Sequence, residues 1–89
     1  MKITDKHLLE IIKATPLVSI DLVIRNPTGK VLLGKRINRP AKGYWFVPGG
    51  MIIKNETIGH ALKRISKAEV GLDLSTEAPR LLGAYDHIY

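Results

Sequence analysis

The stretch Trp45-Phe46-Val47-Pro48-Gly49-Gly50 is followed, at defined spacings, by Glu56, Arg64, Glu69 and Gly71. Aromatic and β-branched residues predict a short strand over 45–47, and the proline and glycines predict a turn that ends it. Beyond that turn, apolar residues recur at spacings of three and four, which predicts a helix over 57–70. Its predicted buried stripe consists of Ile58, Ala61, Leu62, Ile65 and Ala68. Gly71 is expected to cap this helix, so a glycine turn is joined to a helix that carries acidic residues.

The rest of the chain predicts one more helix and several extended segments. Residues 4–14 have an apolar face and a capping residue at Thr4 or Asp5, and the helix should end before Thr15-Pro16. Strands are predicted over 17–24, 31–35 and 80–89, the first two joined by a turn at 26–29. This order is that of an α/β (α+β) fold, and 89 residues form at most one domain, residues 1–89.

The composition argues against several classes of protein. The chain has no cysteine, which excludes disulfides and zinc-thiolate sites and fits a cytoplasmic location. Its net charge is +6, but the basic residues are scattered and accompany no DNA- or RNA-binding motif, so we expect no nucleic-acid partner. No segment reaches the roughly 18 apolar residues that span a bilayer, so we expect no membrane contact.

Gly49, Gly50 and Glu69 are candidates for a metal site. Adjacent glycines let the backbone approach an ion closely. Glu69 borders the apolar stripe of the predicted helix, and a carboxylate is a hard oxygen ligand of the kind magnesium prefers. Taken alone, the glycines are explained by an ordinary turn and Glu69 by a solvated helix position. The spacing that joins them through Glu56 and Arg64 favours the metal site.

This spacing resembles the Nudix hydrolase signature, Gly-x5-Glu-x7-Arg-Glu-hydrophobic-x-Glu-Glu-x-Gly-hydrophobic. The matching positions are Gly50, Glu56, Arg64, Glu69, Gly71 and Leu72. Ile65, Ser66 and Ala68 replace the first helix glutamate, the hydrophobic residue and the first of the paired glutamates. One subfamily, GDP-mannose mannosyl hydrolase, is similar in having this depleted version, and the similarity to it extends through residues 15–19, 33–36, 38–41, 43–50 and 68–69.

The resemblance implies a Nudix-type mixed β-sheet with a catalytic helix, and magnesium-dependent hydrolysis of GDP-mannose or GDP-glucose. In that subfamily water attacks the anomeric carbon of the sugar, GDP leaves, and one Mg²⁺ on the diphosphate stabilises the leaving group. The carboxylate of Glu69 and the carbonyl of Gly49 are the implied metal ligands. Glu56 and Arg64 are implied to pair and, with Gly50, to support the motif.

Further roles are implied by the same resemblance. Arg36 would contact the diphosphate, although an exposed arginine at a strand end is an equally simple interpretation. Asp21 would help hold the sugar or its cationic neighbours, the alternative being an outward-facing strand position. His87 would be auxiliary near the sugar, whereas His7 and His60 are interpreted as helix-surface residues. Lys2, Ile3 and Leu8 would contact the guanine. The resemblance also implies a homodimer.

The sequence also departs from the subfamily. Met51 stands where an arginine commonly helps to neutralise the leaving diphosphate. A third metal ligand, a glutamine, and the catalytic histidine are expected beyond position 89, so we expect a Nudix fold incomplete at its C-terminus with weak or no activity unless another chain completes the site. Two alternatives stay open. One is a pyrophosphohydrolase of another nucleoside diphosphate sugar, against which Ile65 and Ala68 argue; the other is a non-catalytic nucleotide-binding remnant.

Overall fold

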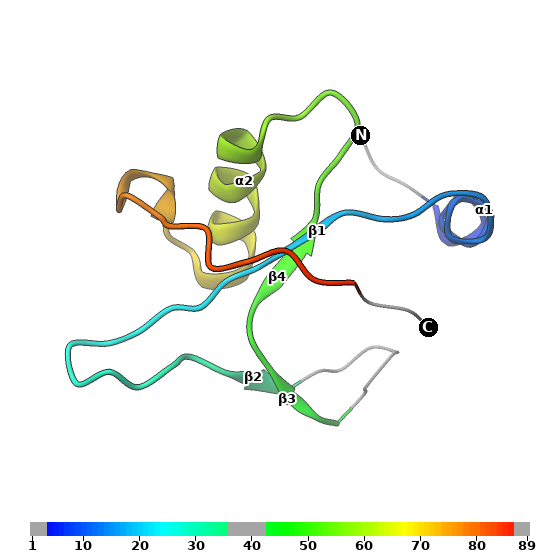
Figure 1. The fold of residues 1–89 in the computed structure, drawn as a ribbon. Coiled ribbons are helices and arrows are strands. Elements are labelled where there is room, and N and C mark those ends of the chain that lie inside the picture. Colours follow the sequence, from blue (N-terminus) through cyan, green and yellow to red (C-terminus); the bar gives the residue numbers. More distant parts are fainter. Residues whose placement is uncertain (1–3, 36–42, 87–89) are drawn as a thin grey trace.

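The computed structural model describes residues 4–35 and 43–86, and these combine helices with short antiparallel strands (Figure 1). The mixed α+β class predicted from the sequence is therefore confirmed. The elements in chain order are α1 (Asp5–Ala14), β1 (Ser19–Asp21), β2 (Gly34–Lys35), β3 (Trp45–Phe46), β4 (Gly49–Met51), α2 (Ile58–Val70) and the 3-10 turn η1 (Leu74–Thr76). No helix among the described residues is long and apolar enough to cross a membrane.

The strands form two separate pairs. β1 pairs with β4 and β2 pairs with β3, both antiparallel, so the parallel pairing that a mixed sheet requires is not found in the described part of the chain. The predicted turn at 26–29 is present, because the side-chain Oδ1 of Asn26 accepts hydrogen bonds from the backbone nitrogens of Thr28 (3.1 Å) and Lys30 (2.9 Å). An isolated bridge between Arg25 and Val31 closes this hairpin. Its arms are shorter than predicted because they separate beyond the bridge to join different partners.

Two predictions about extended segments are wrong. Gly49 and Gly50 lie in β4 rather than in a turn, since Leu22 donates a backbone hydrogen bond to the Pro48 carbonyl at 2.8 Å and so continues the ladder past the proline. Residues 80–86 form no strand, because no ladder partner lies beside them among the described residues. The remainder of that predicted strand, residues 87–89, lies outside the described residues.

Both predicted helices are confirmed, with the predicted caps at Thr4 and Gly71 and a further cap at Thr57. In α1 the hydroxyl of Thr4 accepts a hydrogen bond from the His7 amide at 3.3 Å, and in α2 Thr57 does the same for His60 at 3.1 Å. Gly71 caps α2 with φ = +76°, a left-handed conformation that costs glycine little. These local signals act within a few residues, which is why the sequence alone predicts them.

The buried face of α2 differs in part from the predicted stripe. Ala61 and Ile65 are buried with Leu22 in the small core, but Ile58 and Ala68 are exposed. The two-stranded β1–β4 sheet is too narrow to cover the whole apolar face of the helix. Ser66 is buried instead, because its hydroxyl donates to the Lys63 carbonyl (3.2 Å) and accepts from the Leu74 amide (3.0 Å).

The extended run through β1 has two distinct faces. Ile20, Leu22 and Ile24 belong to the core cluster that packs on α2. The alternate residues Ser19, Asp21, Val23 and Arg25 are all exposed, as the two-residue period of extended backbone requires. This alternation assigns Asp21 to the face of the sheet away from the helix.

Candidate functional site

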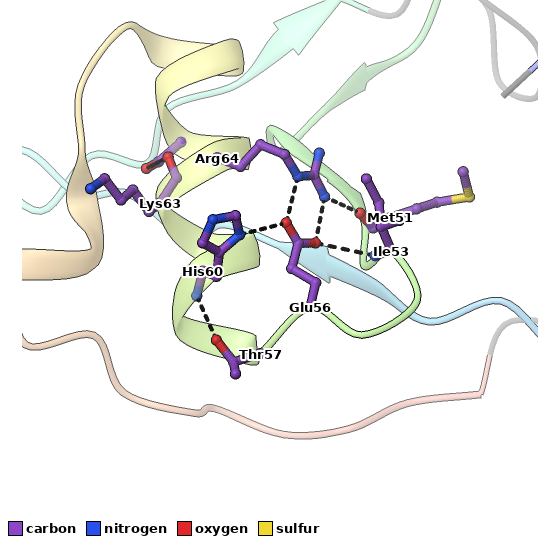
Figure 2. A network of polar contacts seen from close by, with 8 residues as sticks. Met51, Ile53, Glu56, Thr57, His60, Lys63 and Arg64 are labelled. Atoms are coloured by element: carbon purple, nitrogen blue, oxygen red, sulfur yellow. Dashed lines mark hydrogen bonds and ion pairs between the residues drawn. The ribbon is translucent and has the colours of Figure 1, made fainter. Parts of the chain in front are cut away.

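The loop between β4 and α2 is held by a carboxylate with four hydrogen bonds (Figure 2). Arg64 donates to Glu56 twice, from Nε to Oε2 at 2.8 Å and from Nη2 to Oε1 at 2.9 Å. The Ile53 amide donates to Oε1 at 3.1 Å, and His60 Nδ1 lies 3.0 Å from Oε2. Because an ionised carboxylate only accepts, Nδ1 carries the hydrogen of that bond. Arg64 Nη2 also donates to the Met51 carbonyl at 2.7 Å, which ties α2 to β4.

This environment strongly favours the charged form of Glu56. The side chain is only 7% exposed, and the hydrogen bonds from Arg64, with smaller contributions from His60 and Ile53, lower its pKa far below the ordinary range despite the opposing effect of burial. The pKa of Arg64 is raised by the same pair. Both carboxylate oxygens of Glu56 are therefore engaged within the protein, which leaves this residue poorly suited to bind a metal ion.

The lowered pKa of Glu56 predicts a loss of stability in acid. A glutamate in an unfolded chain has a pKa of about 4.3, so below about pH 5 the unfolded state binds more protons than the folded state. The free energy of unfolding should then fall as the pH is lowered, and Glu56→Gln should remove that part of the slope. Urea denaturation at a series of pH values from about 6 to about 3 measures it. Glu10→Gln, which alters an exposed carboxylate on α1, is the control; equal slopes for wild type and Glu56→Gln would contradict the prediction.

Gly49 occupies a position where the backbone of β4 comes very close to β1. A Cβ atom at Gly49 would overlap the Ile20 carbonyl oxygen and stand 3.0 Å from Asp21 Oδ1. Leu22 N donates to Pro48 O in the neighbouring pair, and Ile52 N donates to Val18 O at the other end of the ladder. Because hydrogen-bonded and non-hydrogen-bonded pairs alternate, the Asp21–Gly49 pair is a non-hydrogen-bonded one. It follows that the Gly49 carbonyl points away from β1 and accepts nothing from that strand.

Glu69 lies on the part of α2 that follows the contact with β4. A Cβ at Gly50 would stand 3.2 Å from Ile65 Cγ1, so these two residues pack directly against each other. Glu69 is one helical turn beyond Ile65 and is exposed. The helix α2 runs in the opposite direction to β4 (Figure 1). Going along the helix from Ile65 to Glu69 therefore leads in the same direction as going back along the strand from Gly50 to Gly49.

The order of the elements thus places Gly49 and Glu69 towards the same end of the contact between β4 and α2. Two oxygen donors lie there, the Gly49 carbonyl, which points away from β1, and the exposed carboxylate of Glu69. Magnesium is commonly held by few protein oxygens together with water and phosphate. Within residues 4–35 and 43–86 no three His, Asp or Glu side chains gather as a metal cluster.

The other predicted site residues fall into two groups. Two of them are described by the structure. Asp21 is exposed and lies beside Gly49, whereas Leu8 is half-buried in α1. The remaining predicted residues lie outside the described residues: Lys2, Ile3, Arg36 and His87.

A hollow of about 450 Å³ lies beside the Glu56 network, on the loop before α2 and the first turns of that helix. Sequence reasoning assigned no role to His60, which lines this hollow and reaches Glu56. The spacing of Glu56 and His60, four residues apart at a helix start, was the signal that could have indicated their contact.

Comparison with known proteins identifies the family. The family model for the NUDIX domain matches residues 15–89, most of the chain. The chain belongs to the Nudix family. Nudix hydrolases generally use divalent metal ions and act on small molecules linked to a nucleotide.

Three relatives extend this result. The chain is 49% identical over 88 residues to the low-salt glycan biosynthesis protein Agl8 of Haloferax volcanii, a match that covers 99% of this chain and 54% of the relative. It is 40% identical over 70 residues to an ADP-ribose pyrophosphatase of Methanocaldococcus jannaschii, covering 79% and 40%. It is 38% identical over 55 residues to an RNA pyrophosphohydrolase of Coxiella burnetii, covering 62% and 23%. The chain thus spans about half, or less, of the length of these relatives.

Proposed function

We propose that this Nudix chain acts in the magnesium-dependent hydrolysis of GDP-mannose, or of GDP-glucose, to GDP and the free sugar by attack of water at the anomeric carbon. Gly49 and Glu69 would hold the ion through oxygen atoms, and the ion would supply positive charge to the departing diphosphate. The similarity to a glycan biosynthesis protein supports a nucleotide sugar as substrate, since such compounds are the activated donors from which glycans are built.

The main support for the proposal comes from the positions of α2 at which the Nudix signature has glutamates and this chain has none. Ile65, at the place of the first helix glutamate, is 2% exposed and packs on Gly50, and Ser66 beside it is fully buried. Ala68 has no ligand atom in its side chain. A reaction at phosphorus assisted by several metal ions would lack ligands at these positions, whereas departure of a diphosphate bound to one ion needs fewer ligands, of which Glu69 and the Gly49 carbonyl would be two.

Other residues enter the proposal through the resemblance. Arg36 would bind the diphosphate with its planar guanidinium, Asp21 would act on the sugar side, and His87 would be auxiliary there. Lys2, Ile3 and Leu8 would contact the guanine. The proposal also includes a homodimer in the cytoplasm.

Hydrolysis in isotopically labelled water tests which bond is broken. We expect the label in mannose and none in GDP, because the attacked atom is the anomeric carbon. Mass spectrometry of the two products measures the label, and hydrolysis without Mg²⁺ is the control. Label in a phosphate product would contradict the proposal.

A second candidate is a pyrophosphohydrolase, favoured by the similarity to an ADP-ribose pyrophosphatase and to an RNA pyrophosphohydrolase. It requires attack at phosphorus and so predicts the opposite position of the label. The buried, apolar Ile65 weighs against this candidate, because the ligands for additional ions would have to come from elsewhere.

A further inference from the structure

Two arginines that are distant in the sequence line one small hollow. The hollow measures about 230 Å³, and its walls are formed by Val23, Arg25, Arg80 and Leu82. Arg25 lies at the bridge that closes the hairpin, and Arg80 lies in the irregular segment after η1, which Figure 1 draws in orange to red across the β1 region. Both arginine side chains are exposed and so accessible to a ligand.

The charges around this hollow are unbalanced. Its lining contains no acidic residue, and the ion pairs found among the described residues join Glu56 to Arg64 and to His60, not to Arg25 or Arg80. Two guanidinium groups on the walls of one hollow repel each other, in a chain whose net charge is already +6. An anion between them would reverse this repulsion and give each arginine a charge-assisted partner.

We propose that Arg25 and Arg80 bind a phosphoryl group in this hollow. The planar fork of arginine matches phosphate oxygens, and two such groups lining one hollow could each donate to the same phosphoryl group. The volume is below the range of about 300–1,000 Å³ usual for whole small-molecule ligands, so the hollow suits one phosphoryl group rather than an entire nucleotide sugar. Val23 and Leu82 provide apolar contacts for any organic part attached to it.

The hollow lies away from the Glu56 network. Val23 and Arg25 lie on the exposed face of the β1 run together with Asp21, which is the face away from α2. Glu56 and Arg64 belong to the loop before α2 and to the helix itself. Binding of phosphate in the hollow is measured without turnover, so its failure would leave the proposed hydrolysis intact.

Titration of the full chain with inorganic phosphate at constant ionic strength tests this site. The arginine Nε–H signals of Arg25 and Arg80 should shift together and reach saturation in nuclear magnetic resonance spectra. Arg25→Gln and Arg80→Gln should each raise the Kd at least about tenfold, because each removes charge-assisted hydrogen bonds. A parallel titration with glycerol phosphate identifies the form of the ligand: tighter binding of the ester indicates an organic phosphate, and tighter binding of the ion indicates free phosphate.

Lys67→Gln is the matched control, because it removes one positive charge from an exposed position on α2. Its Kd should stay within about twofold of wild type, since general attraction through solvent is screened by salt. An equal loss of affinity in Lys67→Gln, or unchanged affinity in both arginine variants, would overturn the proposal.

Discussion

Replacing Glu69 with glutamine is expected to weaken Mg²⁺ binding by at least about 100-fold, since even the partners of metal ligands contribute 10–100-fold. Hydrolysis of GDP-mannose should slow by about 10²–10³-fold, the usual cost of losing one group that stabilises developing negative charge. The physical reason is that an amide keeps the shape of the carboxylate but not its charge. Calorimetric titration with Mg²⁺ measures the first effect independently of turnover, and a steady-state assay measures the second.

The thermal stability of this variant should be unchanged, because Glu69 is exposed on α2. Glu77→Gln, at an exposed carboxylate after η1, is the matched control and should bind Mg²⁺ as wild type does. Equal Mg²⁺ affinity in Glu69→Gln and wild type would show that the ion is held elsewhere.

Gly49→Ala is expected to lower the free energy of unfolding by about 3 kcal/mol, at the upper end of the usual cost of overpacking. The added methyl group would overlap the Ile20 carbonyl oxygen, which is backbone and cannot turn aside as a flexible side chain would. Relief requires β1 and β4 to separate, and that would break the ladder that carries Leu22 into the core. Urea denaturation followed by circular dichroism measures the change.

Gly59→Ala is the matched control for that substitution. Gly59 lies in α2 with nothing within 4 Å of the added Cβ, so alanine there should stabilise the protein by about 1 kcal/mol through its better helix propensity. The two glycine-to-alanine changes should thus have opposite signs. A destabilisation of similar size at both positions would show that the close approach of β1 to Gly49 is not what limits the substitution.

The sequence predicted features that depend on neighbouring residues. The caps at Thr4 and Gly71 and the turn at Asn26 each form within a few positions, and all three are present. The family, too, could be predicted from residue spacing, because the glycine and the charged helix positions of the motif recur at fixed intervals.

Features that depend on distant residues were not predicted. Gly49 and Gly50 have the composition of a turn, but they pair with β1 as a strand. A Cβ at Gly49 would overlap the Ile20 carbonyl oxygen, and one at Gly50 would press on the Ile65 side chain. The exposure of Ile58 follows from the narrowness of a two-stranded sheet, which helical periodicity does not reveal. The four hydrogen bonds to Glu56 also require the loop conformation. The sequence spacing of Glu56 and Arg64 predicts their pairing but not the bonds from Ile53 and His60.

The claim on which the account depends is that one magnesium ion is shared by a backbone carbonyl of β4 and a carboxylate of α2. A crystal structure of the protein with Mg²⁺ and GDP measures this directly. We predict a single ion at about 2.0–2.1 Å from both the Gly49 oxygen and a Glu69 carboxylate oxygen, with diphosphate oxygens and other oxygen ligands such as water filling the rest of its octahedral coordination. An ion that lacks the Gly49 oxygen or the Glu69 carboxylate as a ligand, or several ions held around the phosphorus, would contradict the account.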